Sequence, residues 1–347
     1  MLSLGRLDGA TTTLPDVDLL LYTFVRKEAV LSSQIEGTQS TLDELLIHEV
    51  QAIPGALGED VREVSRYVDA LNHGLERIAG GFPLANRLLR EMHGILLAEG
   101  RGAQKQPGEF RSSQNWIGGA RPGNASFVPP PPTHLDACLT NFEQYLHQPT
   151  NPVVKAALAH LQFETIHPFL DGNGRLGRLL TTLLLCSAGV ITEPVLYLSL
   201  YLKRHRSTYY ELLQAVRTRG VWEDWVEFFL MGATETGQQA VASARRIHQL
   251  LEDDRKKIET LGRAAPNAAR LHLAMARRPI TNIRRAAEEL GVTQPTATDA
   301  VMHLIDLGIL VEITGRARGR LFRYRDYMAI LDEGTEPLRE LALTTRT

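Results

Sequence analysis

The sequence predicts a mainly α-helical protein that ends in a small domain containing two strands. Three observations lead to this fold class. Apolar residues recur at helical spacing over most of the chain, and a long stretch that lacks this spacing is rich in glycine and proline. Near the C-terminus, a helix-turn-helix pattern is followed by two short segments that alternate between apolar and polar residues.

Helical patterns fill the N-terminal part of the chain. Gly37 follows the first pattern at a position where glycine commonly ends a helix. Thr41 and Glu44 match a capping box at the start of the second pattern. The predicted helices are Asp18–Ile35, Thr41–Val50, Glu59–Gly80 and Leu84–Ala98.

The stretch from Glu99 to Thr133 differs from its surroundings. It contains many glycines and the run Pro129–Pro132, which excludes a regular helix. A loop of this length inside a compact domain is uncommon and often functional. We expect Gln114–Ile117 and Ser126–Val128 to form a short β-hairpin within it.

Helical patterns resume after this loop and lead to a separate C-terminal domain. The predicted helices are Leu135–His147, Val153–Ile166, Arg175–Ala188, Ser207–Arg217, Trp222–Ser243 and a linking helix Gln238–Leu261, with Tyr197–Leu200 as a connector. Ile283–Leu290 and Thr296–Leu307 form the helix-turn-helix pattern, and Leu310–Thr314 and Leu321–Tyr324 flank a turn, which together predict a winged helix. We therefore divide the chain into an N-terminal helical region (1–98), a catalytic core (99–236), a linking helix (237–262), a winged helix (263–332) and a tail (333–347).

Composition limits the classes of function. The 347 residues are 44% hydrophobic and carry a net charge of −2, which argues against electrostatic nucleic-acid binding by the whole molecule. Cys138 and Cys186 are too few for a disulfide framework or a zinc site. We find no signal-peptide pattern and no apolar run near the roughly 18 residues that a membrane helix requires. These features favour a cytoplasmic protein without a membrane partner.

The segment His167–Arg178, HPFLDGNGRLGR, concentrates unusual chemistry. Two glycines flank Asn173 just before a predicted helix, so backbone N–H groups at a positive helix end offer an anion site. Arg175 and Arg178 oppose the helix dipole there, a conflict that a polyphosphate ligand would remove. Asp171 is suited to Mg²⁺ beside substrate phosphates, and His167 to accepting a proton from a hydroxyl group.

Other interpretations of this segment explain less of it. The dinucleotide-binding fingerprint GxGxxG requires a preceding strand, whereas Val153–Ile166 has a helical pattern. An EF-hand would need a ligand and a glycine where Arg175 and Leu176 stand. A capped turn between two helices, with a core histidine, accounts for His167 alone but not for all the polar and glycine positions together.

The segment resembles the signature of the Fic family, H-P-F-x-[D/E]-G-N-G-R-x-x-R, at every position. This resemblance implies a helical Fic fold and transfer of AMP from ATP to a Ser, Thr or Tyr hydroxyl of a protein. It implies that His167 is the general base and that Asp171 is the Mg²⁺ ligand. Arg175 and Arg178 would contact the β- and γ-phosphates. The ATP-binding residues are then Gly172, Asn173, Gly174, Arg175, Leu176, Gly177 and Arg178.

A second motif lies in the first predicted helix. Ser32 and Glu36 share a helix face and match the inhibitory pattern of the Fic family, [S/T]-x-x-x-E-[G/N]. Negative charge is disfavoured at the C-terminal end of a helix, so Glu36 requires a cation, which the resemblance identifies as Arg178. The resemblance implies autoinhibition by blocked γ-phosphate binding. In some relatives this glutamate also helps to remove AMP, and the sequence does not separate the two roles.

Two further regions resemble parts of the Fic fold. Gly108–Gly119 together with Phe127–Pro130 resembles the flap, a hairpin that docks a target by strand addition, with Ile117 and Gly118 at the acceptor site. Tyr209 and Arg217 lie in the segment that approaches the nucleotide base in the family, although tyrosines on helices belong more often to the core.

The sequence of the C-terminal domain does not decide which kind of partner this domain binds. A local cluster of arginines points to DNA phosphates, whereas Asp299 and Asp306 on the candidate recognition helix oppose them. Winged helices also mediate homodimerisation or protein docking. We expect an adenylyltransferase acting on a protein hydroxyl, its own chain included. The alternative is a DNA-binding regulator whose Fic domain senses nucleotides, but His167 and Asp171 favour the enzyme because sensing needs no general base.

Overall fold

The computed structural model describes residues 2–13, 18–51 and 58–338. The N-terminal helices are α1 (Leu2–Thr13), α2 (Asp18–Ile35), α3 (Leu42–Gln51), α4 (Glu59–Ala79) and α5 (Asn86–Leu96). The central helices are α6 (Pro132–Leu146), α7 (Pro152–Ile166), α8 (Asn173–Ser187), α9 (Ser199–Arg204), α10 (Arg206–Arg219) and α11 (Trp222–Glu259), with a 3-10 turn η1 at Pro122–Asn124. This order confirms a mainly helical fold.

Local signals explain several helix starts. The capping box predicted at α3 forms, because the Thr41 amide donates to Glu44 Oε2 at 2.9 Å and the Glu44 amide to Thr41 Oγ1 at 3.2 Å. At α7, the Asn151 side chain accepts from the amides of Val153 and Val154. Both contacts satisfy N–H groups that a helix start leaves without partners.

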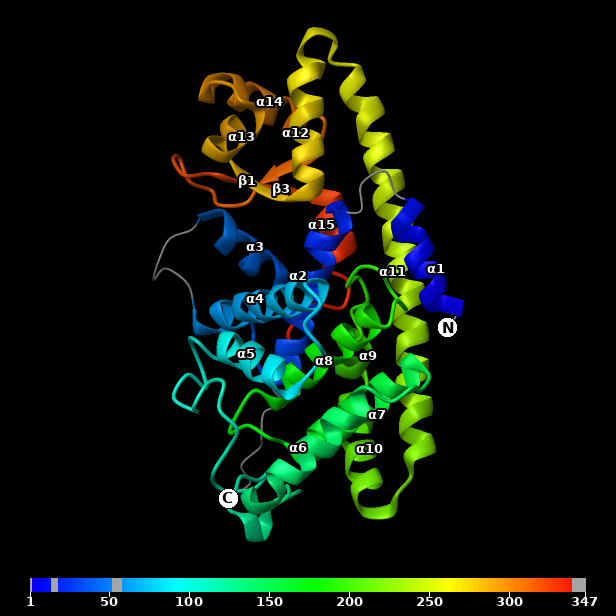
Figure 1. Ribbon diagram of the computed structural model, residues 1–347. Helices are drawn as coiled ribbons and strands as arrows, with labels where there is room; N and C mark the ends of the chain where they lie inside the picture. Colours follow the sequence, from blue (N-terminus) through cyan, green and yellow to red (C-terminus); the bar gives the residue numbers. More distant parts are fainter. Residues whose placement is uncertain (1, 14–17, 52–57, 339–347) are drawn as a thin grey trace, which may run out of the picture.

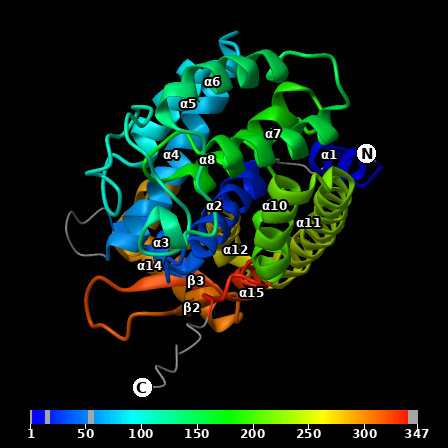
Figure 2. The ribbon, with the colours of Figure 1, turned by 90° about the horizontal axis from the view of Figure 1, so that it is seen from below.

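Helix α8 is the centre of the fold. It lies between α2, α4, α5 and α7 in both views (Figures 1 and 2). Leu176, Leu179, Leu180 and Leu183 are fully buried along it. Residues 175–185 of α8 are buried on every side of the helix, and this packing fixes the N-terminal end of α8, where the motif loop (residues 167–172, between α7 and α8) lies.

The structure differs from the sequence prediction in several elements. Helix α1 was not predicted, and it packs along α11 (Figure 1). The two helices predicted as Trp222–Ser243 and Gln238–Leu261 are one helix of 38 residues, α11. The second half of the predicted connector Tyr197–Leu200 is helical, because α9 begins at Ser199. The expected hairpin between Gln114 and Val128 is reduced to one isolated bridge, Ile117 to Phe127, because glycines and prolines leave few residues able to pair.

A C-terminal unit of helices and a small sheet follows α11. Its elements are η2 (Gly262–Ala264), α12 (Ala265–Arg277), β1 (Ile280–Asn282), α13 (Ile283–Leu290), α14 (Gln294–Asp306), β2 (Leu310–Glu312), β3 (Leu321–Tyr324) and α15 (Arg325–Leu331). The sheet is antiparallel with the order β1-β3-β2, and Ile280 pairs with Arg323 and Leu310 with Tyr324. The strand β1 and the helix α15 were not predicted.

The C-terminal unit packs on the N-terminal helices (Figure 1). Tyr324 donates to Asp254 Oδ2 of α11 at 2.8 Å and contacts His272 Nε2 of α12 at the same distance. Helices α12 and α15 contact α2, and β1 contacts α3. The unit therefore lies directly on α2, the helix that carries Ser32 and ends just before Glu36.

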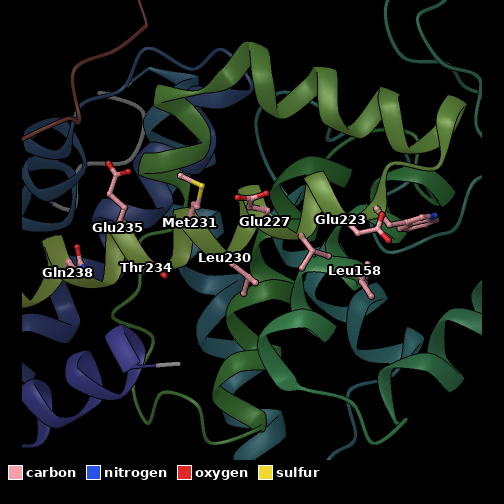
Figure 3. A pocket seen from close by; sticks show the side chains of 10 residues that line it. Leu158, Glu223, Glu227, Leu230, Met231, Thr234, Glu235 and Gln238 are labelled. Carbon is pink, nitrogen blue, oxygen red and sulfur yellow. The ribbon is translucent and has the colours of Figure 1, made fainter.

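Two surface features are separate from the motif loop. A shallow groove of about 800 Å³ follows α11, where Glu227, Leu230, Met231 and Thr234 succeed one another (Figure 3). None of the residues that line this groove belongs to the motif loop. Within the described ranges, no helix combines the length and the apolar character needed to cross a membrane.

Candidate active site

His167 is the residue at which α7 ends. Its φ of 50° and ψ of 60° place it in the left-handed region. In the described part of the chain, His167 and Gln106 are the non-glycine residues with positive φ. This backbone conformation is uncommon outside glycine, and it clusters at functional sites where the surroundings hold it. The candidate base therefore stands at a strained corner between α7 and the motif loop.

Arg111 holds this corner. Its Nε donates to the His167 carbonyl at 2.9 Å, and its own amide donates to the Pro168 carbonyl at 2.9 Å. The guanidinium also donates to the carbonyls of Pro130 at 2.5 Å and Ile166 at 3.3 Å, and the residue is 2% exposed. Arg111 thus ties both ends of the flap segment to the motif loop. Sequence reasoning missed this role, although Arg111 lies within the segment that resembles the flap.

Asn173 closes the motif loop on itself. Its side chain accepts from the Phe169 amide and donates to the Phe169 carbonyl, both at 2.9 Å. Gly172 has a φ of 73°, which a glycine adopts without strain, and it directs the chain into α8. The side chain of Asn173 is consequently used within the loop, while the amides of the turn lie at the start of α8.

His93 of α5 packs against the motif loop and binds its backbone. The Gly108 amide donates to His93 Nδ1 at 2.8 Å, so Nε2 carries the proton and donates to the Asp171 carbonyl at 3.0 Å. The ring stacks on Phe169 with 3.8 Å between centroids. Burial lowers the pKa of His93 to about 4, which keeps it neutral in this role. No motif in the sequence indicated His93.

Asp171 lies at the edge of the loop. Its Oδ1 accepts from the Gly172 amide at 2.7 Å. A Cβ atom at Gly102, which has a φ of 92°, would lie 2.7 Å from Asp171 Oδ2. The backbone of the long loop thus approaches this carboxylate closely, and the glycine at this position makes the approach possible.

The N-terminal turn of α8 already holds a carboxylate. Arg178 Nη2 donates to Glu36 Oε1 at 2.7 Å, and a Cβ atom at Gly174 would collide with the same oxygen. Arg178 also donates to Ser32 through Nε at 2.7 Å to Oγ and through Nη2 at 3.0 Å to the carbonyl. The structure therefore brings Ser32, Glu36, Gly174 and Arg178 together. The contact of Glu36 with Arg178 agrees with the prediction from the sequence, and the approach to Gly174 is new.

Charge explains why Glu36 remains at this position. Burial on its own would raise the pKa of Glu36, but the charge of Arg178, its hydrogen bond and the charge of Arg175 outweigh burial, so that pKa is lowered. Correspondingly, Glu36 raises the pKa of Arg178 against the effect of burial. Arg178 Nη1 is buried without a hydrogen-bond partner among the described residues. The two N–H groups of Nη1 thus remain for a further acceptor.

Arg175 has a carboxylate partner of its own. Its Nη1 lies 3.2 Å from Glu63 Oε2, and both side chains are almost fully buried. Arg101 joins the same carboxylate through its amide at 3.1 Å and its side chain at 3.4 Å. The contact of Arg175 with a β-phosphate remains a prediction, and sequence reasoning did not foresee Glu63.

The environment of His167 keeps its ring neutral. Burial, followed by the charge of Arg217, lowers the pKa of His167 to about 4. Glu164 lies one turn earlier in α7, with Oε2 at 3.8 Å from His167 Nδ1. Burial and the charge of Glu36 raise the pKa of Glu164 to about 7. A neutral imidazole accepts a proton, so the ring is in the form that a general base requires.

The flap segment crosses in front of this site. Ile117 pairs with Phe127, the Asn115 side chain donates to the Phe169 carbonyl at 2.9 Å, and Gly118 has a φ of 69°. The guanidinium of Arg217 lies 4.0 Å from the centre of the Phe127 ring. The flap is therefore fixed both to the motif loop and to α10.

The residues predicted near the nucleotide base lie against α7. Tyr209 is buried, and its hydroxyl lies 2.9 Å from His160 Nε2. Arg217 donates to the Glu164 carbonyl at 2.8 Å and to Thr165 Oγ1 at 3.3 Å. Both residues are engaged with protein groups, and their contact with a base remains a prediction.

Two predicted ATP-binding residues face the interior. Leu176 is fully buried in the core. A Cβ atom at Gly177 would lie 3.2 Å from Glu164 Oε1, so this glycine lets α7 and α8 approach each other. Their places in the structure indicate packing, and nucleotide contact by either one stays a prediction.

Most arginines of the C-terminal unit are engaged with protein groups. Arg323 contacts Asp43 and Asp332, Arg325 pairs with Asp326, and Arg284 lies 3.7 Å from Glu288. Arg316 and Arg318 are exposed in the turn between β2 and β3. Binding of DNA or of a second copy remains a prediction.

Comparisons with known proteins agree with this geometry. Residues 1–76 match the family model described as Fic/DOC family N-terminal, and residues 83–185 match the model described as Fic/DOC family. A relative named protein adenylyltransferase Fic, from Aedes aegypti, is 41% identical over 125 residues, which are 35% of this chain and 22% of that protein. The chain thus spans about a fifth of the length of this relative.

Solved structures show the same fold. A Fic family protein from Desulfovibrio desulfuricans G20 aligns with a TM-score of 0.57 over 93% of this chain and 94% of its own, at 20% identity. A Fic domain containing signaling protein from Bacteroides thetaiotaomicron aligns with a TM-score of 0.55 over 70% of this chain and 97% of its own, also at 20% identity.

Proposed function

The chain belongs to the Fic/DOC family, and from this premise we propose that it is a protein adenylyltransferase. It would transfer AMP from ATP to a Ser, Thr or Tyr hydroxyl of a protein, its own chain included. The hydroxyl oxygen forms a bond to the α-phosphorus, the bond between the α-phosphorus and the bridging oxygen breaks, and pyrophosphate leaves. The hydroxyl proton passes to His167.

The observation that carries this proposal is the carboxylate at the start of α8. Glu36 lies against Gly174 and accepts a hydrogen bond from Arg178 at 2.7 Å, so this turn binds an anion. Backbone N–H groups at a helix start and a guanidinium are also the groups that bind phosphate. ATP would place its γ-phosphate on Arg178 and its β-phosphate toward Arg175, with Gly172, Asn173 and Gly174 along the chain of phosphates.

His167 fits the role of the base. Its ring is neutral and lies at the corner before this anion site. The negative charge of bound phosphates would raise the pKa of His167 above its value without nucleotide, toward the range in which proton transfer is efficient. Arg111 fixes the backbone of His167, which sets where the ring stands relative to the α-phosphorus.

Asp171 fits a magnesium ion held together with ATP. The described ranges contain no group of three or more His, Cys, Asp or Glu side chains that could hold a metal by themselves. Mg²⁺ is commonly bound by one or two carboxylates together with substrate phosphates and water, and Asp171 lies at the edge of the anion site. When bound, the ion would neutralise charge on the phosphates.

Glu36 would act as an inhibitor of the same site. Its carboxylate occupies the Arg178 group that the γ-phosphate needs, so ATP binds productively only when Glu36 leaves. Ser32 accepts from Nε and Nη2 of Arg178 and keeps the guanidinium in place. Removal of AMP from a modified target would be a second activity of Glu36 at this position.

We also infer that the C-terminal unit is a winged helix, on the order α12, β1, α13, α14, β2, β3. Its exposed turn at Gly315–Gly319, with Arg316 and Arg318, suits a nucleic-acid backbone. A gel shift with generic duplex DNA over a salt series would test the alternative of a DNA-binding regulator. Binding that weakens steeply with salt would support it.

The test of the main proposal compares ATP labelled at the α-phosphate with ATP labelled at the γ-phosphate. Wild type, Glu36→Gly, and Glu36→Gly combined with His167→Ala are each incubated with Mg²⁺ and a cell lysate. We expect strong α-label transfer by Glu36→Gly, weak transfer by wild type, and none by the double variant. Transfer only from the γ-label would indicate a phosphotransferase instead.

A further inference from the structure

Residues 332–336, which follow α15, lie against the last turns of α2 and against α9. Four consecutive backbone carbonyls of this segment accept hydrogen bonds from side chains of these two helices. Lys27 Nζ donates to the Glu333 carbonyl at 2.9 Å, and Lys203 Nζ donates to those of Gly334, at 3.1 Å, and Glu336. The remaining carbonyl, that of Thr335, accepts from Gln34.

Gln34 is the centre of this contact. Its Nε2 donates to the carbonyls of Thr335 and Ser40, both at 2.8 Å, and its Oε1 accepts from Lys203 Nζ at 2.6 Å. The Gln34 side chain is fully buried. A buried amide or ammonium that loses its partners is costly, so Gln34 and Lys203 depend on the C-terminal segment for their place.

Gly334 makes the close approach possible. Its φ of 81° is in the left-handed region, and a Cβ atom there would lie 2.6 Å from Leu200 Cδ1 of α9. Leu200 is itself fully buried. A larger side chain at this position would push the segment away from α9.

Helix α2 connects this segment with the candidate active site. At 3.6 residues per turn, Lys27 and Gln34 lie on one face of α2 and Ser32 lies on the opposite face, while Glu36 directly follows the last residue of the helix. The first face is held by residues 333–336, and the second holds Arg178. The last turn of α2 is thus fixed between the C-terminal segment and α8.

We propose that residues 332–336 clamp the end of α2 and thereby keep Glu36 in the phosphate site, so that the C-terminal unit regulates the enzyme. This inference rests on the proposed function. When the segment leaves, Gln34 loses its bond to Thr335 and Lys203 loses two of its acceptors. The last turn of α2 then loosens, Glu36 separates from Arg178, and ATP binds productively.

The test introduces Gly334→Val in a chain that retains Glu36. We expect target labelling from ATP to rise at least about tenfold, which corresponds to about 1.4 kcal/mol in the balance between closed and open states. Lys203→Met, which removes the ammonium but keeps an apolar stem, should act in the same direction. Gly81→Val is the matched control, because Gly81 has the same positive φ as Gly334, 81°, but a Cβ atom there meets nothing within 4 Å.

The same substitutions in the Glu36→Gly background separate clamping from damage. Gly334→Val should change labelling by less than about twofold there, because no inhibitory carboxylate remains to be released. A loss of labelling in that background would show that the segment supports the fold of the site and not its inhibition, and would overturn the proposal.

Hydrogen–deuterium exchange measures the opening of the end of α2 without depending on catalysis. We expect the amides of residues 31–37 to exchange faster in Gly334→Val than in wild type and in Gly81→Val. Unchanged exchange, or unchanged labelling by Gly334→Val and Lys203→Met while Glu36→Gly is active, would overturn the clamp. If Glu36→Gly transfers no label at all, the proposed function fails, and exchange alone still decides whether the clamp exists.

Discussion

Arg111 offers a direct prediction about how the active site is built. Its guanidinium donates to the carbonyls of His167 at 2.9 Å, Pro130 at 2.5 Å and Ile166 at 3.3 Å, inside the protein. We expect Arg111→Met to leave these carbonyls without a donor and to free the corner at His167. The two shorter bonds involve a charged donor, and together they amount to about 3 kcal/mol.

The loss of these hydrogen bonds can be measured through the rate of AMP transfer. If the lost energy falls on the position of His167, then in the Glu36→Gly background Arg111→Met should lower kcat for AMP transfer by roughly 100-fold. The KM for ATP should change little, because Arg111 contacts no residue of the anion site. A low concentration of guanidinium ion should restore part of the kcat of Arg111→Ala, because it can occupy the vacated position.

Two controls make the prediction refutable. Arg87→Met removes an exposed arginine that pairs with Glu91 and lies over the Phe82 ring, away from His167, and it should leave kcat unchanged. Circular dichroism would show whether Arg111→Met folds. A folded Arg111→Met with normal kcat, or one whose defect lies only in the KM for ATP, would refute the idea that Arg111 positions the base.

Three further predictions concern protons and the flap. Because the pKa of His167 is about 4 before nucleotide binds, kcat/KM of Glu36→Gly for ATP, which reports the free enzyme, should not decline between pH 7.5 and about pH 5.5, and a decline centred near the ordinary value of about 6.5 would contradict this. Burial raises the pKa of Glu164 to about 7, so ionisation of this carboxyl group lowers the free energy of unfolding, increasingly as pH rises from about 4.5 to 7. Glu164→Gln should therefore raise the free energy of unfolding at pH 8 by up to about 3 kcal/mol and by much less at pH 5, which urea titration would measure. Phe127→Ala removes the ring under Arg217, and we expect weaker modification of a protein target at unchanged ATP binding, whereas an equal loss in both would refute a role in target docking.

Local sequence patterns predicted a large part of the fold. The capping box at Thr41 and Glu44 forms, and the helix Ile283–Leu290 has the predicted bounds. Such elements depend on residues a few positions apart, so a single stretch of sequence contains the whole signal. The strand β1 has only three residues, too few to show a period. Its pairing with β3, about forty positions away, determines it instead.

The same difference between local signals and contacts of distant residues applies to the candidate site. The segment His167–Arg178 is continuous, so its chemistry was legible in the sequence. Arg111, His93 and Glu63 were not foreseen, because their partners are backbone carbonyls or residues distant in the chain. The contact of Gln34 with Thr335 joins positions separated by 301 residues, so no local sequence pattern predicts it.

A crystal structure of Glu36→Gly with Mg²⁺ and an ATP analogue that cannot transfer AMP would show where ATP binds relative to the position of Glu36. We predict the γ-phosphate on Arg178, the α-phosphorus facing His167, and the metal beside Asp171. A nucleotide bound elsewhere, or phosphates turned away from Arg178 and the start of α8, would show that Glu36 and ATP do not compete for this site.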